Sequence, residues 1–154
     1  MMECLDDAKE ELKRVDHLIY VSLKYTRTVD VLLNTLGRMI DYYDFIMESL
    51  LKYAEEKRMI MDIPLSPRER ADLIKETFED EIIKENINLY LLMRKLHKSN
   101  PQKEQEFRRH VAMISIIDNR EEIVNIDVIT EYYHMEREFW EYVKNIIESD
   151  MEST

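Results

Sequence analysis

Residues 28–59 carry a hydrophobic pattern that strongly favours a buried helix. In a seven-residue frame starting at Val29, three positions are apolar or aromatic in every repeat. They are Val29, Leu36, Tyr43 and Leu50; Leu32, Met39, Ile46 and Tyr53; and Leu33, Ile40, Met47 and Ala54. An apolar stripe of this width is typical of a helix inside a bundle. The pattern predicts a central helix over about 28–59, roughly 48 Å long at about 1.5 Å per residue.

Further apolar side chains of this segment lie outside the stripe, namely Val31, Tyr42, Phe45 and Leu51. A helix with an apolar residue on its outer face needs a second surface to cover that residue. We therefore expect either that other elements contact the central helix from more than one side, or that it carries a dimer contact. The sequence leaves both alternatives open.

The composition favours an all-α fold. The chain of 154 residues contains one Gly and three Pro, so residues that break helices are scarce. Its length suits one domain with a real core. We expect a single domain over 1–154, built as an up-down helical bundle of four to five helices, with a frayed tail at about 149–154.

Charge and cysteine content restrict the environment and the partners. No apolar run is long enough to span a membrane, and the acidic N-terminus does not resemble a signal peptide. The single cysteine, Cys4, fits a reducing cytoplasm. With 33 acidic and 22 basic side chains, the net charge of −11 disfavours general binding to nucleic acid. We expect a cytoplasmic protein without membrane contact.

The first part of the chain predicts a second amphipathic helix, over residues 4–24, whose apolar residues recur at spacings of three and four. The same seven-residue spacing of apolar residues continues into the central helix, so residues 4–59 form either one long helix or a hairpin. We favour a hairpin with a turn near Tyr25–Thr28, because helices in a monomeric bundle must fold back on each other. Thr28 is the expected cap of the second helix.

Proline and capping residues predict the remaining boundaries. Ser66 and Pro67 form a good helix start, and Asn100 with Pro101 forms another. The expected elements are a loop at 60–66, a helix at 67–97, a short helix at 101–117, a connector at 118–126, and a last helix from a cap at Asp127 to about 149.

One basic stretch stands out on this acidic chain. Residues 94–110 hold six Lys or Arg and two His against two Glu. The candidate binding residues are Arg94, Lys95, Lys98, Arg108, Arg109 and His110. They predict contact with an anion, RNA or an acidic partner. The alternative is a solvated surface whose cations lie favourably near a helix C-terminus.

The last helix contains two further features of chemical interest. Glu136 falls on its apolar stripe, so we expect a buried carboxylate paired with a Tyr, Lys or Arg of another helix, or else a ligand or acid–base group. Glu131 and His134 have the ExxH spacing of di-metal bundles, but those sites require a second such motif, which this sequence lacks. The sequence contains none of the common catalytic motifs. We expect no metal, no cofactor and no catalytic residues.

The stretch MIDYYDFIMESLLKYAEEKRMI, followed by DIPLSPRERADLI, resembles the second-to-third-helix region of the HEPN superfamily of small helical bundles. The similarity covers residues 4–98. It implies dimer formation and, in many relatives, RNA cleavage or action beside a nucleotidyltransferase. The family's ribonuclease motif places four to six residues between an Arg and a His. Arg14 to His17 and Arg94 to His97 have only two between them, so the resemblance implies a member without that nuclease site.

The sequence therefore favours a non-catalytic, intracellular helical-bundle protein that acts through self-association, as a dimer, and through binding of a protein partner. The alternative is a HEPN-like effector of toxin–antitoxin type that binds RNA or a nucleotide through residues 94–110. The two hypotheses differ in whether the basic stretch recognises phosphate.

Overall fold

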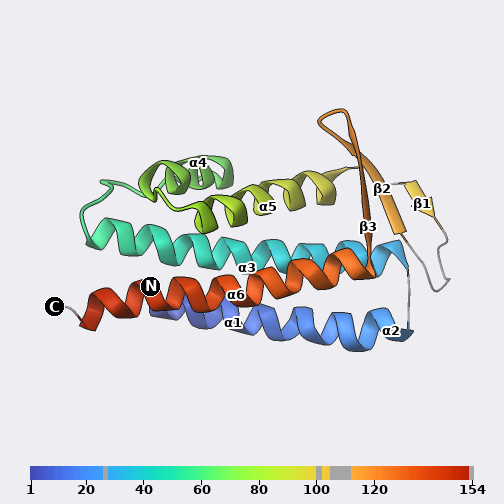
Figure 1. Ribbon diagram of the computed structural model, residues 1–154, viewed down its shortest axis with the longest axis horizontal. Helices are drawn as coiled ribbons and strands as arrows, with labels where there is room; N and C mark the ends of the chain where they lie inside the picture. Colours follow the sequence, from blue (N-terminus) through green and yellow to red (C-terminus); the bar gives the residue numbers. More distant parts are fainter. Residues whose placement is uncertain (26–27, 100–101, 105–111, 153–154) are drawn as a thin grey trace.

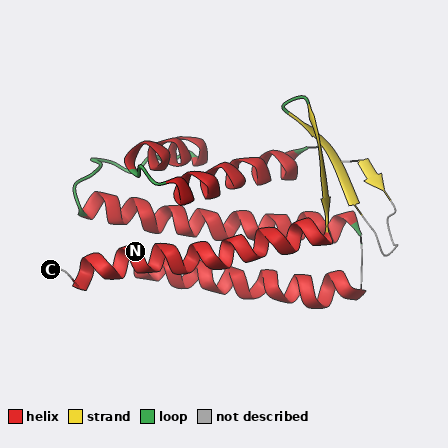
Figure 2. Ribbon diagram, in the orientation of Figure 1, coloured by secondary structure: helices red, strands yellow, loops and turns green. Residues whose placement is uncertain are grey.

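The computed structural model describes residues 1–25, 28–99, 102–104 and 112–152, which form a helical bundle with a small antiparallel sheet at one end (Figures 1 and 2). The prediction of an all-α bundle is confirmed. The helices are α1 (Met2–His17), α2 (Leu23–Tyr25), α3 (Val29–Glu56), α4 (Pro67–Thr77), α5 (Glu81–Lys98) and α6 (Ile126–Glu152); η1 (Leu18–Ser22) is a π-helical turn. The strands are β1 (Gln102–Glu104), β2 (Ala112–Ile117) and β3 (Arg120–Asn125).

Helices α1 and α3 form the predicted hairpin. Near its open end, the Ser49 hydroxyl donates to the carbonyl of Met1 at 2.8 Å, so the start of α1 lies beside the end of α3. Thr28 caps α3 as expected, because its Oγ1 accepts from the Val31 amide at 3.2 Å. The alternative of one continuous helix is therefore wrong.

Helix α3 lies at the centre of the bundle, with α1 and α6 on one side and α4 and α5 on the other (Figure 1). This position explains its apolar residues outside the main stripe. Tyr42 and Leu51 are fully buried, and Val31 and Phe45 pack against the core while half-buried. The first of the two alternatives, contact from more than one side, is confirmed.

The predicted helix over 67–97 is two helices. The chain leaves α4 at Phe78, which is extended (φ −103°, ψ 107°), and starts α5 after Asp80. The Asp80 carboxylate accepts from the Ile83 amide at 3.0 Å, and Phe78 is buried and stacked on Tyr53 at 6.4 Å. Burial of this aromatic ring and the cap together stabilise a break that apolar spacing alone does not indicate. The start of α4 is as predicted, since Ser66 accepts from the Glu69 amide.

The predicted helix at 101–117 and connector at 118–126 are wrong, because strands occupy the described parts of both. β2 and β3 pair antiparallel, from Ala112 opposite Asn125 to Ile117 opposite Arg120. Asp118 and Asn119 make the two-residue turn with φ of 51° and 65°, which favours Asp and Asn over most residues. The isoleucine-rich segment before the turn suits a strand because β-branched side chains pack well on a pleated surface.

Helix α6 begins one residue before the predicted cap and continues to Glu152. Asn125, not Asp127, is the capping residue, because its Oδ1 accepts from the Val128 amide at 2.9 Å. The helix includes residues 149–152, which the sequence suggested would fray. None of the helices described is long and apolar enough to cross a membrane.

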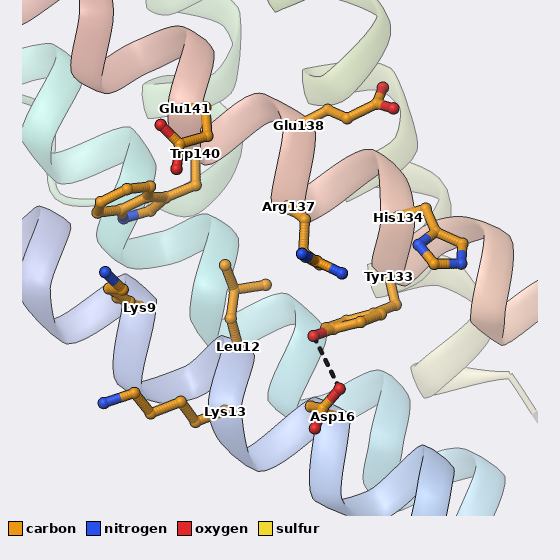
Figure 3. Close-up of a pocket in the computed structure, with 10 residues that line it drawn as sticks. All are labelled: Lys9, Leu12, Lys13, Asp16, Tyr133, His134, Arg137, Glu138, Trp140 and Glu141. Carbon is orange, nitrogen blue, oxygen red and sulfur yellow. Dashed lines mark hydrogen bonds between the residues drawn. The ribbon is translucent and has the colours of Figure 1, made fainter.

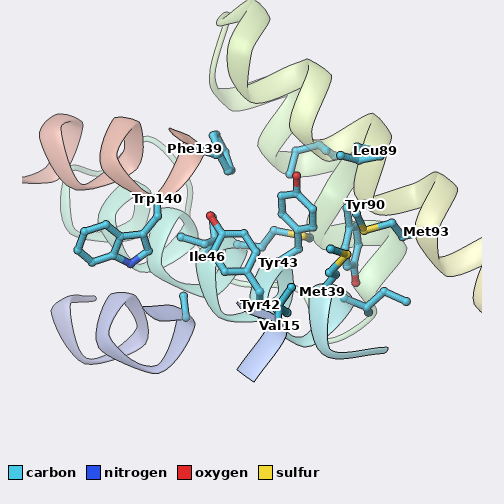
Figure 4. Packing of buried hydrophobic residues seen from close by; sticks show 14 of the residues in the cluster. Val15, Met39, Tyr42, Tyr43, Ile46, Leu89, Tyr90, Met93, Phe139 and Trp140 are labelled. Carbon is cyan, nitrogen blue, oxygen red and sulfur yellow. The ribbon is translucent and has the colours of Figure 1, made fainter. Parts of the chain in front are cut away.

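An aromatic cluster fills the centre of the core (Figure 4). The ring of Tyr43 lies 5.1 Å from that of Tyr42, 5.9 Å from Tyr90 and 6.1 Å from Phe139. The Tyr43 hydroxyl donates to Oδ1 of Asn86 at 2.7 Å. These contacts join α3 to α5 and α6 within one continuous hydrophobic core.

Candidate functional site

A groove of about 390 Å³ lies between α3 and α5 and contains part of the predicted basic site. Its lining residues are Asn34, Gly37, Arg38, Ile40 and Asp41 from α3, and Arg94, His97 and Lys98 from α5. We call this the basic groove. Arg94 and Lys98 were predicted from the sequence, and they come together with Arg38 and His97, which were not.

Gly37, the only glycine of the chain, lines this groove next to His97 of α5. A Cβ atom at this position would lie 3.3 Å from Nε2 of His97, tighter than ordinary contact. A glycine inside a helix costs about 1 kcal/mol relative to alanine. Helix α3 continues through it without a break, so Gly37 provides space for His97 and does not end a helix.

The other predicted cations lie elsewhere. Lys95 donates to Asp118 of the β2–β3 turn at 2.7 Å and does not line the groove. Arg108, Arg109 and His110 lie outside the described residues. The local clustering of cations along the sequence therefore identifies only one wall of the groove, and Arg38 reaches it from a distant part of the chain.

Arg94 is held above the ring of Tyr90, with 5.8 Å between the guanidinium carbon and the ring centre. The Tyr90 hydroxyl donates to Asp44 at 2.6 Å. Burial and this hydrogen bond raise the pKa of Tyr90, whereas burial raises the pKa of Asp44 and Arg94 partly opposes that increase. Arg94 therefore lies over a neutral aromatic face that keeps its guanidinium in place.

The basic surface continues from the basic groove towards α1. A neighbouring groove of about 360 Å³ shares Asn34 and Arg38 with it and adds Lys13, Arg14 and His17 among its lining residues. The buried carboxylate of Glu11 pairs with Arg14 and lies 3.8 Å from Nη1 of Arg38. Glu11 thus holds two guanidinium groups from different helices.

A larger groove of about 680 Å³ lies between α1 and α6 (Figure 3). We call it the α1/α6 groove. Across it, the Tyr133 hydroxyl donates to Asp16 at 3.0 Å, and Trp140 Nε1 donates to the Leu5 carbonyl at 2.8 Å. Burial and the bond to Asp16 raise the pKa of Tyr133 to about 12. These bonds fix how α1 and α6 lie against each other.

Charged groups of both signs border the α1/α6 groove. The Lys9 ammonium lies 4.8 Å from the centre of the Trp140 ring, and the Arg137 guanidinium lies 5.8 Å from that of Tyr133. Cations therefore cover much of the aromatic floor. His134 also lines this groove, but no metal-binding cluster of His, Cys, Asp or Glu occurs among the described residues.

Glu136 is fully buried, as predicted, but its expected partner is absent. Within the described structure, neither carboxylate oxygen makes a hydrogen bond. The nearby Tyr42 hydroxyl donates instead to the main-chain carbonyl of Glu136, at 2.6 Å. Burial raises the pKa of the Glu136 carboxyl well above its ordinary value. Glu136 lines none of the grooves described above, so the geometry does not give it a ligand.

Comparison of the chain with protein-family models, curated proteins and solved structures gave no match. The grooves are therefore the features from which a function can be inferred, and the HEPN resemblance stays a prediction.

Proposed function

We propose that this chain is a non-catalytic protein that acts by binding, and that the basic groove holds phosphate groups of a nucleotide or RNA. The observation that supports this proposal is the convergence of Arg38, Arg94 and Lys98, with His97, around the only glycine. Among the described residues that line the groove, Asp41 is the only one with a carboxylate. Arginine suits phosphate because its planar fork can donate two parallel hydrogen bonds.

The location of these cations also supports the proposal. A protein with a net charge of −11 repels polyanions over most of its surface, so a local basic groove directs them to one place. Arg94 is preorganised by Tyr90, and Arg38 lies 3.8 Å from the Glu11 carboxylate. Preorganised side chains lose less conformational entropy on binding. These features fit an RNA- or nucleotide-binding effector of the HEPN-like type better than a solvated helix surface.

We also propose a cytoplasmic location, because Cys4 is a buried free thiol. Self-association is part of the proposal as well. The apolar residues outside the main stripe of α3, which suggested a dimer contact, are mostly covered by other helices of the same copy. Within one copy of the chain, Tyr42 and Leu51 are buried and Val31 and Phe45 are half-buried, so these residues leave little apolar surface for a dimer contact.

The proposal is tested by titrating labelled single-stranded RNA and, separately, ATP with the double variant Arg94→Glu/Lys98→Glu. At low salt, we expect the variant to bind each ligand at least about tenfold more weakly than the wild type does. For RNA, log K decreases with log salt concentration, and the variant should make this slope less steep by about 1.4. The reason is that each phosphate contact on a single strand contributes about 0.7 to the steepness, and the variant removes two.

The matched control is Arg68→Glu/Lys84→Glu, which makes the same change in charge on α4 and the first turn of α5. Arg68 pairs only with the exposed Asp72 among the ion pairs described, so its loss should cost little stability. If wild type binds neither ligand at low salt, or if the control weakens binding as much as the groove variant, the proposal is wrong.

A further inference from the structure

Strand β3, residues Arg120–Asn125, forms one edge of the small sheet at the end of the bundle (Figure 1). It pairs with β2 on one side, and the strand order β1-β2-β3 leaves its other side without a neighbouring strand among the described residues. A strand at the edge of a sheet presents backbone N–H and C=O groups that another chain can pair with. We call the unpaired side of this strand the β3 edge.

The register of the hairpin identifies the residues that face the β3 edge. Its two-residue turn is closed by a hydrogen-bonded pair, Ile117 opposite Arg120. Bonded and non-bonded pairs alternate along an antiparallel ladder, so Glu122 bonds to β2, whereas Glu121 and Ile123 direct their N–H and C=O groups outward. These two residues are therefore the ones available to an added strand.

An apolar strip lies beside the β3 edge, on the outer face of the sheet. Ile123 is 49% exposed and lies opposite Ile114 of β2, and Ile116 of β2 is 67% exposed. The inner face packs on the core, since Met113 and Val124 are buried. Because side chains alternate between the two faces, an added strand covers exposed apolar area as well as unpaired backbone.

The side chains at the β3 edge are mainly acidic. Glu121 is exposed and Glu122 is half-buried, and neither takes part in an ion pair among the described residues. Burial raises the pKa of Tyr132, and the charges of Glu122 and Glu131 raise it further, so both carboxylates lie near the same ring. Arg120 is the only cation of the strand.

We propose that the β3 edge binds an extended, basic segment of a partner protein, which adds to the sheet as an antiparallel strand. Lysine or arginine side chains of this segment lie opposite Glu121 and Glu122, and a β-branched apolar residue lies beside Ile123. Hydrogen bonds to the backbone of Glu121 and Ile123 supply affinity, and the side chains supply specificity. Because the edge pairs with a complementary backbone, the ligand is a polypeptide.

The chemistry of the β3 edge favours this partner over other occupants. The carboxylates of Glu121 and Glu122 repel the phosphates of a nucleic acid. The exposed side chains of Ile116 and Ile123 are too few to anchor a membrane. A second copy of the chain presents the same strand, in which two glutamates outnumber the single cation of Arg120. The proposal is independent of phosphate binding in the basic groove, and either proposal can fail without the other.

The experiment titrates the protein into a fluorescent, end-capped peptide, Thr-Thr-Val-Lys-Lys-Thr-Thr, at low salt and measures anisotropy. This sequence places Val beside Ile123 and Lys opposite Glu122 and Glu121. The variant Glu121→Lys/Glu122→Lys should bind it at least about tenfold more weakly than the wild type does, because like charges then oppose each other. The same variant should bind the counterpart peptide with Glu in place of both Lys, which the wild type should bind poorly.

Amide hydrogen exchange of the wild type distinguishes strand addition from a loose contact between charges. The peptide should slow exchange of the Glu121 and Ile123 amides at least about tenfold, and that of Glu122 much less, because its amide is already bonded to β2. Ile123→Pro removes an outward N–H and leaves the bonds to β2, so it should weaken peptide binding. Ile123→Thr keeps that N–H and should retain most of the affinity.

The matched control is Glu76→Lys/Glu79→Lys, which makes the same change in charge at two exposed positions far from the sheet. It should leave the affinity for the basic peptide nearly unchanged. The proposal is overturned if the wild type does not bind this peptide at concentrations up to about 1 mM, or if the control weakens binding as much as the edge variant. Binding that does not protect the Glu121 and Ile123 amides also overturns it. So does a wild-type dimer, formed without peptide, that Ile123→Pro dissociates, since a second copy then occupies the edge.

Discussion

Glu136 is a buried carboxyl group whose oxygens accept no hydrogen bond from any residue that the structure describes. It is fully buried on α6, and Tyr42 bonds to its main chain instead of its side chain. An unsatisfied buried polar group costs about 1–3 kcal/mol, and a buried charge costs more. The residue therefore lowers stability, and by an amount that depends on its protonation.

Replacement of Glu136 by Gln should show this dependence. The carboxyl pKa is near 4.5 in the unfolded chain and higher in the folded one. Below pH 4.5 both states hold the proton, and Glu136 carries no ionisation penalty. As pH rises above that value, the unfolded state loses its proton first. The unfolding free energy of the wild type therefore falls by about 1.4 kcal/mol for each pH unit until the pKa of the folded state is reached.

We therefore expect the advantage of Glu136→Gln in unfolding free energy to be small at about pH 4 and to grow as pH rises from there towards neutral, because the pKa of Glu136 is raised in the folded protein. Urea unfolding of both proteins across this range measures it. A difference that does not vary with pH would show that Glu136 ionises in the folded protein as readily as in the unfolded one.

At the scale of the elements, Asp80 makes two hydrogen bonds at the junction of α4 and α5. Asp80 accepts from the Ile83 amide, and it also accepts a hydrogen bond from the Tyr142 hydroxyl of α6. That second bond, more than burial, raises the pKa of Tyr142. The residue that starts α5 is thus also the one that attaches it to α6.

Asp80→Ala should lower the unfolding free energy by about 1–2 kcal/mol through loss of the cap, and Tyr142→Phe should cost less because it leaves the cap intact. Urea unfolding with circular dichroism detection measures both. Asp72→Ala, which removes only an exposed partner of Arg68, is the control and should change stability little. Equal losses in all three variants would contradict the role of the cap.

The sequence predicts correctly those helices whose spacing of apolar residues matches the face that is buried in the core. The apolar stripe of α3 and the capping residue Thr28 are local signals, and together they were enough to predict this helix and where it begins. At 101–117 the spacing of Phe107, Val111, Ile114 and Ile117 fits a helix, but β-branched residues before an Asp-Asn turn favour a hairpin. A pattern of spacing alone does not decide between these two.

The residues of the basic groove could also be predicted only in part from the sequence. Arg94 and Lys98 are neighbours on α5, so their clustering is visible in the sequence. Arg38 joins them only because α3 packs against α5, at a place where Gly37 leaves room for His97. The solitary glycine within a strong helical pattern was the available signal, because such a residue usually has a packing reason.

At the scale of the whole molecule, tyrosine hydroxyls join helices that are distant in sequence. Tyr43 bonds to Asn86 of α5, Tyr53 to Asp150 of α6, and Tyr133 to Asp16 of α1. Tyr43 also lies at the centre of the aromatic cluster. The core thus combines apolar burial with directional bonds between helices, which favour one arrangement over others.

Tyr43→Phe should lower the unfolding free energy by about 1–3 kcal/mol, because it keeps the ring but leaves the buried Oδ1 of Asn86 without its donor. Chemical denaturation measures the change. Tyr20→Phe is the matched control, since Tyr20 is 52% exposed and should tolerate the loss. A neutral Tyr43→Phe would mean that the hydroxyl bond is not needed to hold α5 on α3.

Trp140 is the only tryptophan in the chain, and its indole nitrogen is bonded to the main chain of α1. Lys9 and Lys144 both lie within 5.3 Å of the ring centre. Any process that separates α1 from α6 must change the surroundings of this one indole. The protein therefore carries an intrinsic fluorophore, located where two helices meet, that reports their separation without an added label.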